Sequence, residues 1–524
     1  MKPFHLIALG LLAVAAPAMA APPADLDAKV EAFRQKVGAT GVSIAIVENG
    51  KTTLAKGWGI RKLGESAKVD SHTIFQTGST GKAMTAAALA ILVDEGKIAW
   101  DDPVIKHMPW FRMSDPWVTR EITVRDLLVH RSGLGLGQGD LMFVPRTKLT
   151  RKQTVEHVAY LKPKTSFRSG YAYDNILYAV AGQLIEEVTG KTWEVFVRER
   201  LLRAGGMKDA TTDSEDRFRV VNRSYPHARL SGPLRGLGPQ QLLDERDELG
   251  RNGAPAGGIA MSAEDQAAWL KIQLAHGGLP DGKRLFSEKQ ALEMWNPVVT
   301  MPITQLPPAL APAMPNYQAY ALGWQVQDYR GHRIIAHSGG VFGSITRVVI
   351  VPDRNIAFAI MMNSEDSGML LGLYYMILDH YLGASDYDWP TKWQNWYETR
   401  LEGGRAALTQ KQATPVKVGP SLDLSRYAGR YRDPWYGDVV VASTPDGLTM
   451  DFTSTPRMVG KLKHWQYDSF VSEYDDKAIE PAYVTFALDA DGKVTGVTMK
   501  AANPIADFSW DYQDLDLKPV VDAK

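Results

Sequence analysis

Thr73-Ile-Phe-Gln-Thr-Gly-Ser-Thr-Gly-Lys82 runs directly into Ala83-Met-Thr-Ala-Ala-Ala-Leu-Ala-Ile-Leu-Val93, and this junction carries more information than any other part of the chain. The first segment is strand-like at its start, and the second is an apolar, alanine-rich run that stops near Gly96. A helix that is apolar on nearly every face is usually buried in the middle of a domain. The junction therefore predicts a strand that leads into a buried helix.

Ser79 and Lys82 stand at positions i and i+3 at the start of this helix, so their side chains share a face. A serine hydroxyl becomes a good nucleophile when a base removes its proton, and a lysine kept neutral by burial can be that base. The tetrapeptide alone is a weak signal, and a lysine whose amine snorkels to the surface is the structural alternative. Lysine has little structural reason to stand in an apolar helix, which favours catalysis.

Two further motifs follow along the chain. Tyr173-Asp-Asn175 precedes a second helical run at 176–188; the tyrosine could pass a proton to a leaving group and the asparagine amide could hold a carbonyl. Taken alone, such a motif is more often a helix cap. His337-Ser-Gly339 and Gly340 end a strand-like run, where a backbone N–H could donate to an oxyanion. A glycine-rich turn is the structural alternative there.

Strand-like runs lie on both sides of the helical region. Runs 41–47 and 52–58, joined by Asn49-Gly50, predict a hairpin, and a third helix is expected after Ser262. The proline-rich stretch 301–315 indicates a loop. Further strands are expected at 320–327, 332–336, 345–351 and 356–362. Strands at both ends with helices between them predict one mixed α/β domain whose sheet joins both termini.

The two ends of the chain have a different character. Lys2, the apolar run 6–16 and Ala18-Met-Ala20 predict a cleaved signal peptide over residues 1–20, and hence a periplasmic or secreted protein. The catalytic domain is expected over 21–395, followed by a polar linker over 396–420. Residues 421–524 contain short β-rich runs with regular turn signals, which predict a small antiparallel barrel or sandwich. This second domain could cap the active site or mediate oligomerisation.

Composition excludes several classes of function. The chain has 524 residues, with 59 basic and 59 acidic side chains and no cysteine. The balanced charge argues against a nucleic-acid partner, and the lack of a long apolar run beyond residue 20 argues against stable membrane insertion. Without cysteine, disulfides and thiolate nucleophiles or ligands are excluded. The 11 histidines form no His-Glu-x-x-His motif, so neither a metal nor a cofactor is expected.

The three motifs, in this order, resemble those of the serine β-lactamase and penicillin-binding-protein superfamily, most closely its class C β-lactamase, D,D-carboxypeptidase and D-aminopeptidase branch. The resemblance covers about residues 25–385 and implies an α/β (α+β) fold, with a mixed antiparallel sheet flanked by helices and a helical subdomain. Residues 421–524 are similar, more weakly, to lipocalin-like β domains that follow some peptidases of the superfamily. The stretches that carry the resemblance are Phe75-Gln-Thr-Gly-Ser-Thr-Gly-Lys82, Ile122-Thr-Val-Arg-Asp-Leu-Leu128, His130-Arg-Ser-Gly-Leu134, Pro255-Ala-Gly-Gly-Ile259 and His337-Ser-Gly-Gly-Val-Phe-Gly343.

The resemblance implies a role for each motif. Ser79 would be the nucleophile that is acylated, Lys82 the group that activates it, and Tyr173 the proton shuttle. The backbone N–H groups of Ser79 and Gly340 would form the oxyanion hole. The substrate would contact Asn175, His337, Ser338 and Gly339.

His337 stands where most β-lactamases of this branch carry the lysine of a Lys-Thr-Gly motif. A lysine is charged at neutral pH and an unperturbed imidazole is mostly neutral, so this departure favours peptide or ester substrates over β-lactams. The leading expectation is an exported serine hydrolase that cleaves amide bonds in a small-molecule or peptide substrate, with peptides that contain D-residues as the favoured class. A carboxylesterase of the same fold is the first alternative, followed by a β-lactamase and by a catalytically silent binding protein.

Overall fold

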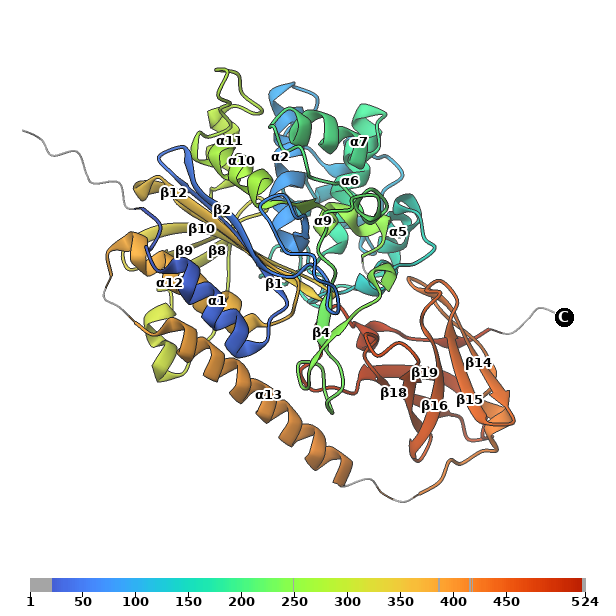
Figure 1. The fold of residues 1–524 in the computed structure, drawn as a ribbon. Coiled ribbons are helices and arrows are strands. Elements are labelled where there is room, and N and C mark those ends of the chain that lie inside the picture. The colour runs from blue at the N-terminus through green and yellow to red at the C-terminus, as the bar shows by residue number, and fades with distance from the viewer. Residues whose placement is uncertain (1–20, 248, 385–386, 414–415, 417, 521–524) are drawn as a thin grey trace, which may run out of the picture.

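The structure is a computed structural model that describes residues 21–247, 249–384, 387–413, 416 and 418–520. The signal peptide expected over residues 1–20 lies outside these ranges. Figure 1 shows a large α/β domain and a β-barrel, with the long helix α13 (Trp389–Ala413) leading from one to the other. None of the helices in the described ranges is both long and apolar enough to span a bilayer.

The large domain is built on one antiparallel sheet that joins strands from both ends of the domain. This confirms the expectation of a single sheet flanked by helices. In sheet order the strands are β2 (Lys51–Gly59), β1 (Gly41–Glu48), β12 (Ile356–Met362), β11 (Ser344–Val351), β10 (His332–Val341), β9 (Gln325–Tyr329), β8 (Gln318–Tyr320) and β7 (Val299–Thr300).

Helices cover both faces of this sheet, which is why β1 is buried along its whole length. Val42, Ile44 and Ile46 pack in one cluster with α1 (Leu26–Val37) and α12 (Ser367–Leu382). The alternate side chains of β1 pack in a second cluster with α2 (Lys82–Asp94) and α10 (Ala263–Leu274). Because successive residues of a strand point to opposite faces, one apolar strand supplies both cores.

A helical subdomain packs against α2 on the side away from the sheet (Figure 1). Helix α6 begins directly after Asn175, and α10 begins at a capping box formed by Ser262 and Asp265. Other helices of the large domain are α3 (Val104–His107), α4 (Pro116–Glu121), α5 (Arg151–His157), α6 (Ile176–Thr189), α7 (Trp193–Val197), α8 (Ser214–Phe218), α9 (Ala254–Gly257) and α11 (Glu288–Met294).

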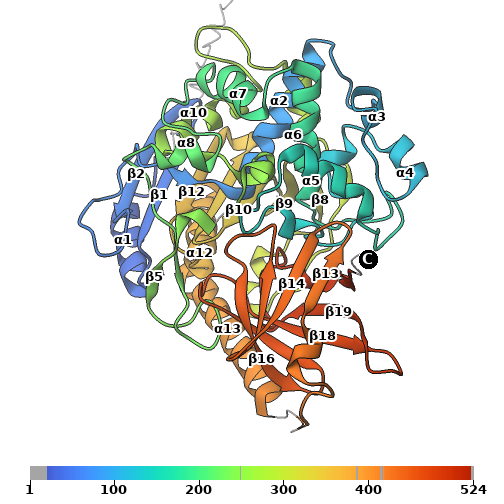
Figure 2. The ribbon, with the colours of Figure 1, turned by 90° about the vertical axis from the view of Figure 1, so that its right-hand side faces the viewer.

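The C-terminal domain is an eight-stranded antiparallel barrel that is nearly closed, because β20 pairs with β13 and Leu517 just before it bridges to Val497 of β19. Buried side chains alternate with more accessible ones along β15 and β17, and the buried ones fill the interior of the barrel. Figure 2 shows the barrel lying beside the helical subdomain. Its strands are β13 (Gly429–Asp433), β14 (Gly437–Thr444), β15 (Gly447–Phe452), β16 (Val459–Gln466), β17 (Ser469–Tyr474), β18 (Ala482–Leu488), β19 (Val494–Ala501) and β20 (Lys518–Pro519).

Three local expectations differ from the structure. The polar stretch over 396–420 is helical as far as Ala413, because α13 continues without a break from Trp389. The strand expected over 320–327 is two strands, β8 and β9, separated by a turn in which Gly323 has φ +78°. Strand β10 does not end at 336 but continues to Val341, so the His-Ser-Gly-Gly run is strand and not a turn.

Candidate active site

Ser79 lies in a single 3₁₀ turn, η1 (Gly78–Gly81), that connects the short strand β3 (Phe75–Gln76) to α2. Lys82 is the first residue of α2, so the expected i, i+3 pair spans the junction of the turn and the helix. Lys82 Nζ lies 3.0 Å from Ser79 Oγ. The sequence motif therefore places the two groups in hydrogen-bond contact.

The other contacts of Lys82 decide how its amine is oriented. Nζ lies 2.6 Å from Asn175 Oδ1 and 2.9 Å from the carbonyl oxygen of Ala256. Both of these oxygens can only accept hydrogen bonds. A neutral amine has two N–H groups and one lone pair, so the two oxygens take both hydrogens. The lone pair of a neutral Lys82 then points at Ser79 Oγ.

Burial makes this neutral state accessible. Lys82 is 0% exposed, so the snorkelling alternative is wrong. Burial lowers the pKa of Lys82 to about 7, because the charged amine loses its hydration, while Asp140 and Asp174 act in the opposite direction. A substantial fraction of this amine is therefore unprotonated at neutral pH.

Asn175 is not a helix cap in the usual sense. It is the N-cap residue of α6, but its side chain makes no hydrogen bond to the helix backbone. Its Oδ1 accepts from Lys82, and its Nδ2 donates to Asp140 Oδ2 at 2.8 Å. The capping alternative thus fails, and the amide connects the lysine to a buried carboxyl group.

Tyr173 belongs to a cluster of aromatic rings. Its ring centroid lies 4.1 Å from that of His130 and 4.9 Å from Lys82 Nζ. A side-chain hydrogen bond with Ser79 opposes the effect of burial, and burial dominates, so the pKa of Tyr173 is well above its ordinary value. The phenol is therefore a neutral hydroxyl beside the Ser79–Lys82 pair. It can donate its proton to one neighbour and then take a proton from another.

His337 is held as a neutral ring. It is 1% exposed, and burial together with the charge of Lys82 lowers its pKa well below the ordinary value. Nδ1 lies 2.6 Å from the carbonyl oxygen of Ser338, which can only accept, so Nδ1 carries the hydrogen. Nε2 then accepts from the hydroxyl of Tyr320, also at 2.6 Å. His337 thus supplies no fixed positive charge, as the sequence comparison with a lysine at this position predicts.

Strand β10 passes directly over the turn that holds Ser79. A Cβ placed on Gly339 would lie 2.1 Å from the carbonyl oxygen of Thr77 and 3.0 Å from Ser79 N, and one on Gly78 would lie 2.7 Å from Gly340 N. Only glycine permits these approaches. They bring the backbone N–H groups of Ser79 and Gly340, the expected oxyanion donors, to neighbouring positions.

The described part of β9 pairs with β10 only as far as Ala336. From His337 onward, β10 is paired along its β11 edge, where Ser338 stands opposite Arg347 and Gly340 opposite Ile345. Ser338 is half-buried and Gly340 is exposed, and both lie on a stretch of β10 whose second edge does not pair with β9. An extended substrate can add to such an edge.

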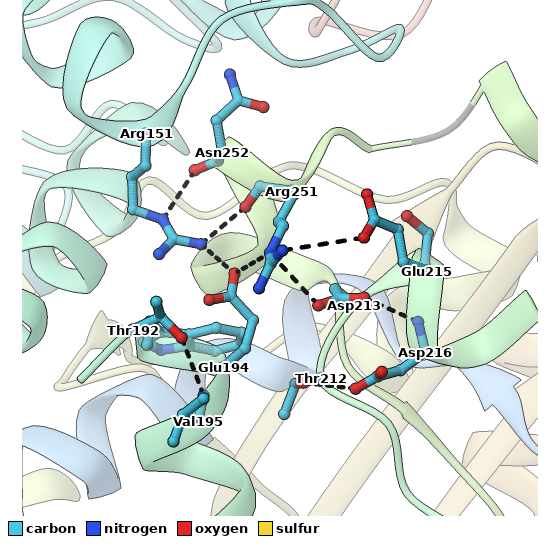
Figure 3. A network of polar contacts seen from close by, with 12 residues as sticks. Arg151, Thr192, Glu194, Val195, Thr212, Asp213, Glu215, Asp216, Arg251 and Asn252 are labelled. Atoms are coloured by element: carbon cyan, nitrogen blue, oxygen red, sulfur yellow. Dashed lines mark hydrogen bonds and ion pairs between the residues drawn. The ribbon is translucent and has the colours of Figure 1, made fainter. Parts of the chain in front are cut away.

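The carbonyl of Ala256 is positioned by a polar network around the segment that precedes α9. Figure 3 shows Arg151 donating to the carbonyl oxygens of Arg251 and Asn252 and pairing with Glu194. The Asn252 side chain donates in turn to Met142 O at 2.9 Å. Arg151, Glu194 and Asn252 are buried, so this network fixes the backbone that provides one of the two acceptors for Lys82.

A cavity of about 260 Å³ opens on Ser79. The large α/β domain, which is the expected catalytic domain, contributes Asn175 and Gly340 to the wall of this cavity. The C-terminal barrel domain contributes the opposite wall. The barrel residues in the wall are Glu480, Asn503, Ile505, Asp507, Ser509 and Trp510. The C-terminal domain is therefore part of the pocket, and the space for a substrate depends on both domains.

The structure brings together every residue expected from the motifs, and it adds groups that the sequence did not reveal. Asp140 and Ser509 are joined to the site through Asn175. His130 and Tyr320 were not expected there; His130 is enclosed by aromatic rings, 4.4 Å from the ring of Tyr320, and has no exposed surface. His130 belongs to a stretch that carries the superfamily resemblance, which was the one available signal for it.

A serine one turn ahead of a buried lysine, below a glycine-rich strand of an antiparallel sheet, defines the serine β-lactamase and penicillin-binding-protein class. The Beta-lactamase family profile matches residues 26–379, and the chain belongs to this family. A second profile, described only as a domain of unknown function (DUF3471), matches residues 413–519, which cover the barrel.

Individual relatives agree with this assignment. An unguisins hydrolase from Aspergillus campestris is 30% identical over 419 residues, which are 76% of this chain and 74% of the relative. Protein flp of Staphylococcus aureus is 25% identical over 65% of this chain and 62% of its own length.

Solved structures show the same fold. An octameric penicillin-binding protein homologue from Pyrococcus abyssi superposes with a TM-score of 0.56 at 20% identity, covering 91% of this chain and 98% of its own. The D-amino acid amidase of Ochrobactrum anthropi superposes with a TM-score of 0.54 at 21% identity, covering 69% of this chain and 98% of its own.

Proposed function

We propose that the protein is a serine hydrolase that cleaves amide bonds in peptides, including peptides with D-residues, through an acyl-enzyme on Ser79. The observation that carries this proposal is the orientation of Lys82, whose two acceptor oxygens leave its lone pair for Ser79 Oγ. The names of a relative and of a structural neighbour, an unguisins hydrolase and a D-amino acid amidase, support a hydrolase of this substrate class.

In the acylation step, Lys82 Nζ takes the proton of Ser79 while Oγ attacks the carbonyl carbon of the substrate. The oxyanion that forms accepts hydrogen bonds from the N–H groups of Ser79 and Gly340. Tyr173 donates its hydroxyl proton to the departing amine nitrogen and recovers a proton from Lys82. The C–N bond breaks, and the amine leaves with the acyl group attached to Oγ.

Deacylation reverses these proton movements with water in place of the amine. Tyr173 and Lys82 take a proton from the attacking water, and the ester bond to Oγ breaks. Ser79 recovers its proton, and the product leaves as an acid. The residues named supply every proton transfer in both steps.

The neutral state of His337 supports peptides over β-lactams as substrates, because this position offers no fixed cation for a substrate carboxylate. The cavity wall contributed by the barrel supports a substrate of limited size on the side facing Glu480 and Trp510. Ester hydrolysis on the same fold remains the alternative that a substrate panel tests.

The rate of Ser79 acylation should rise about tenfold per pH unit below pH 7 and level off above it. The reason is that Lys82, with a pKa of about 7, lacks a free lone pair while it is protonated. His337 does not contribute to this rise in rate between acidic and neutral pH, because its pKa is well below the ordinary value. The second-order rate constant for a fluorophosphonate, measured across this range, checks the prediction; a flat profile contradicts it.

Incubating the protein and a Ser79→Ala variant with a fluorophosphonate, and separately with a penicillin, tests the proposed nucleophile by intact mass. We expect a fluorophosphonate adduct on the parent protein and none on the variant. A parent protein that forms no adduct with either reagent overturns the serine mechanism. Aminoacyl amides of both configurations, D-Ala-D-Ala peptides and p-nitrophenyl esters then separate peptidase from esterase activity, and sustained penicillin turnover would identify a β-lactamase.

We further propose that the protein is exported, on the strength of the signal-like pattern over residues 1–20. The expected result is a mature chain that begins at Ala21, found outside the cytoplasm. The mass of the protein recovered from each compartment tests this, and a chain that keeps residues 1–20 in the cytoplasm contradicts it.

A further inference from the structure

The orientation of the Asn175 amide has a cause outside the expected motifs. An amide can present either its oxygen or its NH₂ group to Lys82, and only the oxygen leaves the amine lone pair free for Ser79. Asn175 Nδ2 donates to Asp140 Oδ2 at 2.8 Å, and Oδ2 also accepts from Ser509 Oγ, so this oxygen faces Asn175 as an acceptor. Asp140 therefore selects the amide orientation in which Oδ1 faces Lys82.

Asp140 is itself held by the C-terminal domain. Ser509 Oγ donates to the same carboxyl oxygen, Oδ2, at 2.8 Å. The carboxyl oxygens of Asp511 accept from the backbone N–H groups on both sides of Asp140, from Gly139 at 2.6 Å and from Leu141 at 3.1 Å. Asp140 and Asp511 have no exposed surface, so these contacts are shielded from water.

We propose that Asp140 is a positioning residue for the Ser79–Lys82 pair, that it acts through Asn175, and that Ser509 and Asp511 of the C-terminal domain hold it in place. The barrel would then be part of the catalytic apparatus as well as of the pocket wall. This inference rests on the proposed serine mechanism, since it concerns how the base of that mechanism is aligned.

The charge of Asp140 affects the pKa of Lys82, so the pH dependence of Ser79 acylation reports on this contact. Asp140 raises the pKa of Lys82, and burial raises the pKa of Asp140 itself to about 7, so both groups titrate near neutral pH. The other titratable groups that face either of them are Asp174, His130, His337, Tyr173, Tyr178, Asp507 and Asp511. Burial keeps the two histidines and the two tyrosines neutral in this range.

An Asp140→Asn variant separates alignment from simple packing. The substitution preserves the shape of the side chain but removes the charge and lets either end of the new amide face Asn175. We expect the plateau rate of Ser79 acylation to fall at least about tenfold. We also expect the midpoint of the pH limb to move to lower pH, because Lys82 loses a nearby negative charge. A purely structural role for Asp140 would not move that midpoint.

The probe is a fluorophosphonate, which reports on the nucleophile whatever the natural substrate is. In this reaction the Ser79 proton passes to Lys82, a bond forms between Oγ and phosphorus, and the P–F bond breaks to release fluoride. Rates are measured on the full chain by intact mass, and thermal unfolding of each variant shows that it is folded.

Variants of Ser509 test the contribution of the C-terminal domain without touching the catalytic domain. Ser509→Ala should change the rate and the midpoint in the same direction as Asp140→Asn and by a smaller factor, and Ser509→Thr should restore both. Lys164→Met is the matched control, because it removes the 2.7 Å ion pair with Asp514 between the same two domains but no contact of Asp140. It should leave the rate and midpoint unchanged.

The outcomes are distinguishable. A parent protein that forms no adduct overturns the proposed function and this inference together. A reactive parent with Asp140→Asn at the parental rate and midpoint overturns the inference alone. If Asp140→Asn is impaired but Ser509→Ala has the parental rate and midpoint, Asp140 remains a positioning residue. The proposed contribution of the C-terminal domain is then wrong.

Discussion

Replacing Lys82 by methionine should slow the acylation of Ser79 by about 10³-fold, since general-base catalysis contributes on this scale. Methionine matches the length of the lysine stem and carries no charge, so it suits the buried position. It leaves the oxygens of Asn175 and Ala256 without their donor, at a cost of about 1–3 kcal/mol for each buried group. The protein should therefore remain folded with reduced thermal stability, and the loss of rate should exceed what that reduction explains.

Fluorophosphonate labelling measured beside thermal unfolding separates the two effects of Lys82→Met. Lys106→Met is a suitable control, because this surface lysine pairs with Asp102 at a distance from the cavity and its replacement should leave labelling unchanged. Full reactivity of Lys82→Met would show that another group, with Tyr173 the nearest, takes the serine proton.

Gly339→Ala should lower the acylation rate by about 10²-fold or more, which is the scale for removing one oxyanion donor. The new Cβ would meet the carbonyl oxygen of Thr77 at 2.1 Å. That carbonyl is fixed, because it accepts from Thr346 Oγ1 at 2.7 Å. Strand β10 must therefore move away from the turn that holds Ser79, and the two oxyanion donors must separate. Overpacking of this kind also costs about 1–3 kcal/mol of folding stability.

The neighbouring Gly340 provides the comparison. A Cβ at Gly340 has no atom within 4 Å, and neither glycine has a left-handed backbone. Gly340→Ala should change the free energy of unfolding by less than about 0.5 kcal/mol, while Gly339→Ala should be clearly destabilised. Denaturant unfolding measures this difference. Equal stability of the two variants would contradict the close packing of β10 on the Ser79 turn.

The contact between Ser79 and Lys82 could be predicted because it is local. Ser79 and Lys82 are three residues apart, and a lysine in an apolar helix is conspicuous in any sequence. The hairpin of β1 and β2 could also be predicted, because the Asn49-Gly50 turn and the two β-rich runs that it joins are adjacent in the chain. In each case the signal and the structure involve the same few residues.

What the sequence could not show depends on contacts between distant segments. Ser509 reaches Asp140 across a separation of 369 residues, and no pattern near either residue indicates the other. Helix α13 looked like a linker because its surface is polar, yet Leu401 and Leu408 pack in a small cluster with Leu234. A glycine-rich turn was the structural alternative at 339 and 340, but both residues lie in β10, and Gly339 permits the close approach of this strand to the Ser79 turn, which only the fold reveals.

The contacts made by Ser509 and Asp511 carry a consequence for the order in which the enzyme matures. A chain is synthesised from its N-terminus, so every residue of the catalytic domain exists before the segment that holds Asp140. Until the barrel has folded and docked, the backbone at Gly139 and Leu141 lacks its acceptors, and the pocket lacks one wall. If Asp140 positions the base as proposed, we expect the full rate of Ser79 acylation only after the barrel has docked.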